Sequence, residues 1–168
     1  DYQNLIAQEA QRGHTVAIHS ASHDYAKIYQ SVDAYFADFD EMNSIITAQT
    51  GKAADLVRFP GGSSNTISKK YCYGIMSQLV CAVEERGFRY CDWNVSSGDA
   101  GGTTSTSQVV ANVIAGIKGN NVSVVLQHDI KNFSVDAVEQ IIQWGLSEGY
   151  TFLPITSTTP MSHHGVNN

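Results

Sequence analysis

Three histidines follow predicted strands, and their positions suggest metal binding and acid–base chemistry. His19 and His23 are four residues apart, a spacing that can direct two imidazoles at one metal ion. His128 comes soon after the apolar run Val122–Leu126, and an imidazole there could act as a general acid or base because imidazole titrates near neutral pH. The alternative for each histidine is a ring that bonds only to backbone or caps a loop.

Two charged residues follow other strand-like runs. Arg58 stands beside Pro60-Gly61-Gly62, where glycine permits close backbone approach, and arginine can hold a carboxylate with two hydrogen bonds. Asp99 lies in the Gly/Ser/Thr-rich loop 96–107. We predict that Arg58 fixes an active-site carboxylate such as Asp99. A surface ion pair for Arg58 and a simple turn role for Asp99 are the alternatives.

Alternating helices and strands are expected to position these side chains. Apolar residues recur at helical spacing, and a glycine follows each predicted helix, in the segments 3–12, 31–50, 75–86, 107–118 and 134–148. Mostly apolar runs, typical of buried parallel strands, follow at Thr15–Ile18, Leu56–Phe59, Phe88–Val95, Val122–Leu126 and Tyr150–Ile155. The alternation predicts an α/β fold in which the candidate residues share the edge where parallel strands end.

The number of predicted strands indicates whether they could close a barrel. Five runs are too few to close a barrel of the usual eight strands, and the chain opens on a helix, in the middle of a βα unit. Either the sheet is small and open, or one or two βα units are missing from the N-terminal side.

Length and composition indicate one globular domain. The chain has 168 residues, of which 42% are hydrophobic and 15% charged. A net charge of −6 without a Lys/Arg cluster argues against non-specific nucleic-acid binding. No apolar run is long enough to span a membrane, and no signal peptide is recognisable. We expect a domain over 1–158 and a polar tail over 159–168, frayed from Met161 onward.

Other titratable residues are given no part in the site. His14 precedes the first predicted strand and is interpreted as structural, and His163 and His164 fall in the tail. Helix 31–50 is expected to turn a solvated acidic face outward, formed by Asp33, Asp38, Asp40 and Glu41.

The cysteines lack the spacing of a metal site. Cys72, Cys81 and Cys91 include no C-x-x-C pair, and we interpret them as idle or buried thiols. A Cys72–Cys81 disulfide is the alternative.

Four ordered motifs resemble those of the polysaccharide deacetylases, the NodB-homology group that forms carbohydrate esterase family 4. His19–His23, read as H-S-x-x-H, is similar to the metal-binding motif of that family, and Arg58–Gly62 to its arginine motif. Asp92–Asp99 resembles its tryptophan/aspartate motif, and Val124–Asp129 its final L-x-H-D motif. The resemblance covers roughly residues 1–155.

The resemblance implies a fold and an activity. The fold would be a distorted (β/α) barrel with fewer than eight strands. The activity would be metal-dependent hydrolysis of acetyl groups from polymers that contain N-acetylglucosamine, such as peptidoglycan or chitin, at an extracellular or cell-wall location. His19 and His23 would be ligands of a divalent metal, for which we expect zinc because imidazole suits that ion.

The resemblance also implies roles for the other candidate residues. His128 would be the general acid that protonates the leaving amine, and Asp99 would tune it. Arg58 would anchor the catalytic carboxylate. Leu126 would line the pocket for the acetyl methyl group, and Trp93 would wall the site.

The family's first motif, T-F-D-D, does not occur in this sequence. In the family it supplies the general base and the third metal ligand, and it precedes H-S-x-x-H by about two βα units. We therefore expect an N-terminal segment to complete the site, and this chain alone to be a very weak deacetylase or none. The alternatives are a catalytically deficient carbohydrate-binding fragment, an O-acetyl (acetylxylan) esterase and a metal-free interaction domain.

Overall fold

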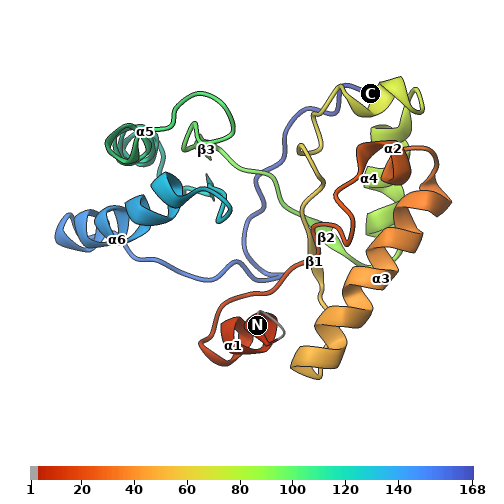
Figure 1. The fold of residues 1–168 in the computed structure, drawn as a ribbon, viewed down its shortest axis with the longest axis horizontal. Coiled ribbons are helices and arrows are strands. Elements are labelled where there is room, and N and C mark those ends of the chain that lie inside the picture. The colour runs from red at the N-terminus through yellow and green to blue at the C-terminus, as the bar shows by residue number, and fades with distance from the viewer. Residues whose placement is uncertain (1–3) are drawn as a thin grey trace. The chain divides into compact units, whose positions relative to one another are not determined.

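The computed structural model describes residues 4–168, which separate into two compact units (Figure 1). The first unit contains the described residues up to Asp92 together with Pro154–Asn168, and the second contains Trp93–Leu153. Each unit combines helices with a short parallel sheet, so the predicted α/β class is confirmed.

The first unit is built on three short parallel segments. Strand β1 (Leu56–Val57) pairs in parallel with β2 (Arg89–Tyr90), and Ile18 forms a single parallel bridge to Val57 on the other side. The helices around them are α1 (Leu5–Gln11), α2 (Tyr25–Ile28), α3 (Val32–Thr50), the 3₁₀ turn η1 (Ser68–Lys70) and α4 (Ile75–Glu85).

Helix α3 illustrates how local sequence sets the elements of this unit. Ser31 caps its N-terminus by accepting a hydrogen bond from the amide of Ala34, and Gly51 ends it with a φ of 75°. The buried side of α3 contributes aromatic rings to the core, which also contains Tyr29 and Phe59. Packing of this apolar face, rather than helix propensity, stabilises the helix.

The second unit has the same organisation on a smaller scale. Strand β3 (Val95–Ser96) pairs in parallel with β4 (Val125–Leu126), and helices α5 (Thr106–Lys118) and α6 (Asn132–Ser147) pack against each other. Helix α5 approaches β3 so closely that a Cβ at Gly116 would collide with Val95. The buried core consists of Val109, Val113, Ile117, Ala137 and Ile141.

The helix predictions are confirmed within a few residues. The strand predictions hold only in part, because Thr15–Ile18 forms a single bridge at Ile18, Val122–Leu126 is a strand only over Val125–Leu126, and two other predicted strands are wrong. Phe88–Val95 is not one strand, because its first part pairs with β1 and its last part with β4. Between them, the backbone amide of Asp92 donates to Ser162 and that of Asn94 to Val124, so the chain changes partners there.

The second wrong prediction is the strand at Tyr150–Ile155, where the structure has no strand. Tyr150 instead donates its amide to Gly145 and packs its ring on Trp144. Phe152 lies where a Cβ of Gly145 would be. Side-chain packing against α6 thus replaces strand pairing at the start of this segment.

The C-terminal residues are not frayed, contrary to prediction. Asn168 is buried, its side chain accepts from the amide of Gly74 and donates to Ser68, and its carbonyl accepts from the amide of Ser77. The ring of His163 stacks on Tyr90 at 3.9 Å between centroids. The polar composition of residues 159–168 predicted a frayed tail, but polar groups such as those of Asn168 form hydrogen bonds with the rest of the first unit. The domain boundary after residue 158 stays a prediction.

Two smaller findings complete the fold. Cys72, Cys81 and Cys91 are free thiols. Among residues 4–168, no helix is both long enough and apolar enough to cross a membrane.

Candidate active site

The two histidines of the H-S-x-x-H motif lie next to each other in the first unit. His19 follows the bridge at Ile18, and its ring centroid is 5.1 Å from that of His23. Nδ1 of His19 lies 2.7 Å from the carbonyl oxygen of Arg58. Because a carbonyl only accepts, this contact puts the ring proton on Nδ1 and the lone pair on Nε2, the arrangement that a metal ligand needs.

Asp38 holds the loop between the two histidines. Its Oδ2 accepts from the hydroxyl of Ser20 at 2.6 Å and from the amide of Ala21 at 2.8 Å, and its Oδ1 accepts from the amide of Ser22 at 2.9 Å. Burial would raise the pKa of Asp38, but the hydrogen bonds from Ser20, Ser22 and Ala21 outweigh it and lower the pKa. The carboxylate therefore stays ionised as the anchor of this loop.

The prediction that Asp38 belongs to a solvated face is wrong. Its side chain is buried, whereas Asp33, Asp40 and Glu41 are exposed as expected. A signal existed in the sequence, because Asp38 comes three residues after Tyr35 and four before Met42, on the apolar side of α3.

The backbone at His23 is strained. His23 has a φ of 52°, which is uncommon for a residue other than glycine. Its amide donates to the hydroxyl of Ser20 at 2.8 Å, and Asp24 then caps α2 by accepting from Ala26. These contacts hold a bend that turns the second ring toward the first.

Arg58 bonds to the backbone that follows β2. Its Nε donates to the carbonyl of Cys91 at 3.1 Å, and Nη2 lies 3.4 Å from that of Asp92. Its predicted partner, Asp99, belongs to the second unit, so that pairing stays a prediction. Arg58 thus holds the ends of β1 and β2 in register.

Asp92 is a second buried carboxylate to which we assigned no separate role. It accepts from the amide of Ser63 at 2.9 Å, from the hydroxyl of Ser63 and from the amide of His164 at 2.9 Å. The side chain of His164 lies 3.1 Å from the hydroxyl of Ser64. Asp92 therefore ties the C-terminal segment to the loop after the arginine motif.

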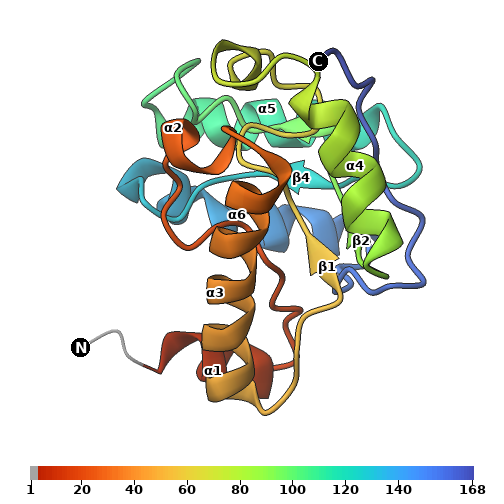
Figure 2. The same ribbon diagram turned by 90° about the vertical axis from the view of Figure 1, so that its right-hand side faces the viewer.

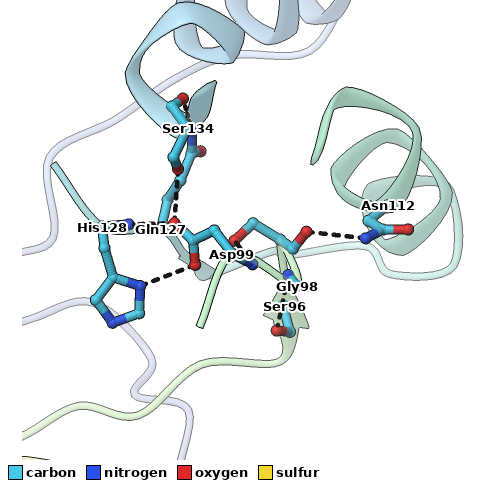
Figure 3. Close-up of polar contacts among 8 residues, drawn as sticks. Ser96, Gly98, Asp99, Asn112, Gln127, His128 and Ser134 are labelled. Atoms are coloured by element: carbon cyan, nitrogen blue, oxygen red, sulfur yellow. Dashed lines mark hydrogen bonds and ion pairs between the residues drawn. The ribbon is translucent and has the colours of Figure 1, made fainter. Parts of the chain in front are cut away.

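In the second unit, Asp99 holds His128 (Figure 3). Oδ1 of Asp99 lies 2.8 Å from Nδ1 of His128, and Oδ2 accepts from the amide of His128 at 2.7 Å and from the hydroxyl of Ser134 at 2.6 Å. Asp99 is buried, whereas the His128 side chain is 39% exposed. The buried carboxylate thus orients a ring that is partly exposed to solvent.

The hydrogen bonds also decide the charge of Asp99. Burial acts to raise its pKa, but donors from Ser134 and His128 outweigh it and hold the pKa at about 2. An ionised carboxylate only accepts, so Nδ1 of His128 carries a proton and Nε2 is the atom left to exchange one.

A glycine shapes the loop before Asp99. Gly98 has a φ of 80°, and a Cβ there would lie 2.7 Å from Nδ2 of Asn112. That nitrogen donates to the carbonyl of Ser97 at 2.9 Å, which holds the loop on α5. Only glycine fits this approach without strain.

The remaining candidates lie beside these residues in sequence. Leu126 ends β4 and is half-buried, and Trp93 precedes β3 and is also half-buried. His19, Arg58, Asp99 and His128 come soon after strand residues of their own unit, as predicted, whereas Trp93 precedes β3. An edge shared by all of them would join the two units and stays a prediction.

A divalent metal fits the histidine pair only in part. His19 and His23 offer two imidazoles, a ligand type that suits zinc. Within the described part of the chain, no group of three or more His, Cys, Asp or Glu residues could hold an ion. The donor set is therefore two ligands, fewer than the three protein ligands usual in a catalytic zinc site.

Comparison with known proteins assigns the family. The family model described as polysaccharide deacetylase matches residues 1–73. A peptidoglycan-N-acetylglucosamine deacetylase of Bacillus cereus is 29% identical over 157 residues, covering 90% of this chain and 54% of that protein. A putative polysaccharide deacetylase of Bacillus subtilis is 24% identical and covers 97% and 56%. The chain thus spans about half the length of these two relatives.

Solved structures agree with this assignment. The catalytic domain of a peptidoglycan N-acetylglucosamine deacetylase from Eubacterium rectale is 69% identical, with a TM-score of 0.98, and the match covers all of this chain and 77% of that one. A polysaccharide deacetylase from Bacillus cereus is 28% identical with a TM-score of 0.80, covering 96% and 76%. This chain belongs to the polysaccharide deacetylases of carbohydrate esterase family 4.

Proposed function

We propose that the chain is the major part of a catalytic domain that removes acetyl groups from polymers containing N-acetylglucosamine, in a metal-dependent reaction. The observation that carries this proposal is the imidazole of His128, held at 2.8 Å by ionised Asp99 in a member of this family. The relatives named as peptidoglycan deacetylases support the substrate class.

His128 is the proposed general acid. Asp99 fixes the proton on Nδ1, so Nε2 is the atom that delivers a proton to the nitrogen of the scissile amide. Protonation is needed because an amine leaves poorly as an anion, and a positioned acid contributes about 10²–10⁴-fold to such a step. Ser134 and the amide of His128 keep Asp99 in place during this transfer.

His19 and His23 are the proposed metal ligands, with zinc as the expected ion. When bound, such an ion supplies polarisation of the acetyl carbonyl and of the attacking water. Arg58 aligns His19 through its own carbonyl oxygen, and Asp38 sets the spacing of the pair.

The missing parts of the site are proposed to lie upstream. A segment before Asp1 would bring the general base and a third ligand, and would complete a distorted (β/α) barrel with fewer than eight strands. Activity on peptidoglycan or a similar polymer would place the protein outside the cell or in its wall.

A carbohydrate-binding fragment without catalysis is the second candidate. It is favoured by the two-ligand donor set, since no third ligand joins the pair among residues 4–168. Such a fragment would bind acetylated oligomers but release no acetate.

Acetate release from acetylated glucosamine oligomers tests the proposal. We expect little or none from the 168-residue chain. A longer protein with the upstream segment should show chelator-sensitive release. Full turnover by the short chain would place the base within these residues, and an inactive longer protein that still binds oligomers would favour the second candidate.

A further inference from the structure

Two lysines and two tyrosines are exposed on one short segment of the first unit. This Lys–Tyr segment, residues 68–73, contains η1 and ends just before α4. Tyr73 is 87% exposed and Tyr71 42%, and Lys69 and Lys70 are exposed as well. Tyr73 thus presents an aromatic ring with a polar hydroxyl to solvent, beside two exposed lysines.

The segment is locally cationic in an acidic protein. The chain has 16 Asp and Glu residues, yet none of them falls between Asp55 and Glu84. In that stretch the charged residues are Arg58, Lys69 and Lys70. Arg58 faces inward to the carbonyl of Cys91, which leaves the lysine pair as the charge that this stretch presents to solvent.

Buried asparagines fix both ends of the segment. Asn65 accepts from the amide of Ser68 at 3.0 Å, and Asn168 donates to the hydroxyl of Ser68 at 2.8 Å. At the other end, Asn168 accepts from the amide of Gly74 at 2.8 Å. The exposed rings are therefore held on an anchored backbone, which lowers the entropy cost of binding.

Further contacts lead from Asn65 toward the histidine pair. Asn65 donates to the carbonyl of Gly62, and a Cβ on Gly61 would lie 2.7 Å from the Tyr25 hydroxyl. The ring of Tyr25 is 5.6 Å from that of His23. Figure 2 shows α2 and the chain between β1 and α4 at the same end of the first unit, as Figure 1 does.

We propose that the Lys–Tyr segment binds an anionic glycan strand that extends beyond the sugar being deacetylated. The inference rests on the proposed function. It adds that this segment binds the carboxylates that a peptidoglycan strand carries on its peptide stems, which neutral chitin lacks. Lys69 and Lys70 would attract those carboxylates, and Tyr73 would stack on a sugar ring.

Binding of two matched glycans tests the proposal without requiring turnover. Calorimetric titration would compare peptidoglycan glycan strands that carry peptide stems with neutral N-acetylglucosamine oligomers of equal length. The variants are Lys69→Gln/Lys70→Gln and Tyr73→Ala. Lys52→Gln is the control, since Lys52 is also exposed but lies beside Thr50 at the end of α3.

We expect the double lysine variant to weaken binding of the stem-bearing strands on the order of five-fold at low salt, with little change for neutral oligomers. Tyr73→Ala should lower the affinity for both glycans by about two- to ten-fold, because both present a sugar ring to stack on. Lys52→Gln should change neither affinity. Circular dichroism checks that each variant is folded.

The inference would be overturned if the double lysine variant bound the stem-bearing strands as tightly as the wild type. It would also be overturned if that variant lost the same affinity for the stem-bearing strands and for the neutral oligomers. The outcome is separable from the proposed function. If the variants show the expected losses of glycan binding but the longer protein releases no acetate, the proposed deacetylase activity is contradicted and the proposed binding segment is supported.

Discussion

The carboxylate of Asp38 accepts a hydrogen bond from the hydroxyl of Ser20 at 2.6 Å, so helix α3 holds the loop between the two motif histidines. Ser20 in turn accepts from the amide of His23. One buried carboxylate thus sets the bend that brings His23 next to His19.

Asp38→Asn should loosen the histidine pair. The ionised carboxylate of Asp38 accepts three hydrogen bonds from this loop, and the neutral amide of asparagine would accept them less well. Loss of a contact that supports a metal ligand typically lowers metal affinity by about 10–100-fold. Zinc affinity of the longer protein would be measured by competition with a chelator dye. Asp40→Asn, an exposed change on the same helix, is the control. Unchanged affinity in Asp38→Asn would remove the positioning role.

His19→Ala/His23→Ala should abolish tight metal binding, because two protein ligands are already few. Elemental analysis after dialysis measures the retained metal. His14→Ala, which changes an exposed histidine ahead of the Ile18 bridge, should keep the wild-type content. Metal retained by the double variant would show that the ion binds elsewhere.

His128→Ala in the longer protein should lower the rate of amide hydrolysis by about 10²–10⁴-fold while the metal content stays the same. Asp99→Asn should lower the rate too, since the amide group does not fix the proton on Nδ1 as a carboxylate does. Steady-state kinetics and elemental analysis together check this. A metal-depleted His128→Ala protein would make His128 a ligand instead of an acid.

Asp99 should make the stability of the second unit depend on pH. Its pKa is about 2 in the folded chain and ~3.9 in an unfolded one, so the folded state favours the ionised form. The resulting stabilisation is fully present above pH ~4 and is lost as the pH falls toward 2.

Thermal unfolding of wild type and Asp99→Asn measures this effect. Between pH 4 and pH 2 (about one unit either side of the midpoint between the two values) the wild-type Tm should fall more steeply than that of the variant. Parallel curves would contradict the depressed pKa. Asp136→Asn, an exposed change on α6, controls for loss of a carboxylate alone.

Local signals in the sequence determined the helices and the chemistry-bearing positions. Apolar spacing located α3 through α6, because each helix buries one face against a core, and Gly51 ends α3 as expected. The order His19, His23, Arg58, Asp99 and His128 was sufficient to indicate the family, since the motifs are short and local.

Only the tertiary structure decided which distant groups pair. Phe88–Val95 was expected to be one strand, but Asp92 and Asn94 bond to other segments and divide it. Asp38 was counted with its exposed neighbours, although the loop at Ser20 offers it three donors. Hydrogen bonds between residues far apart in sequence leave no periodic pattern, so partners such as Asp38–Ser20 and Asn168–Gly74 appear only when the chain is folded.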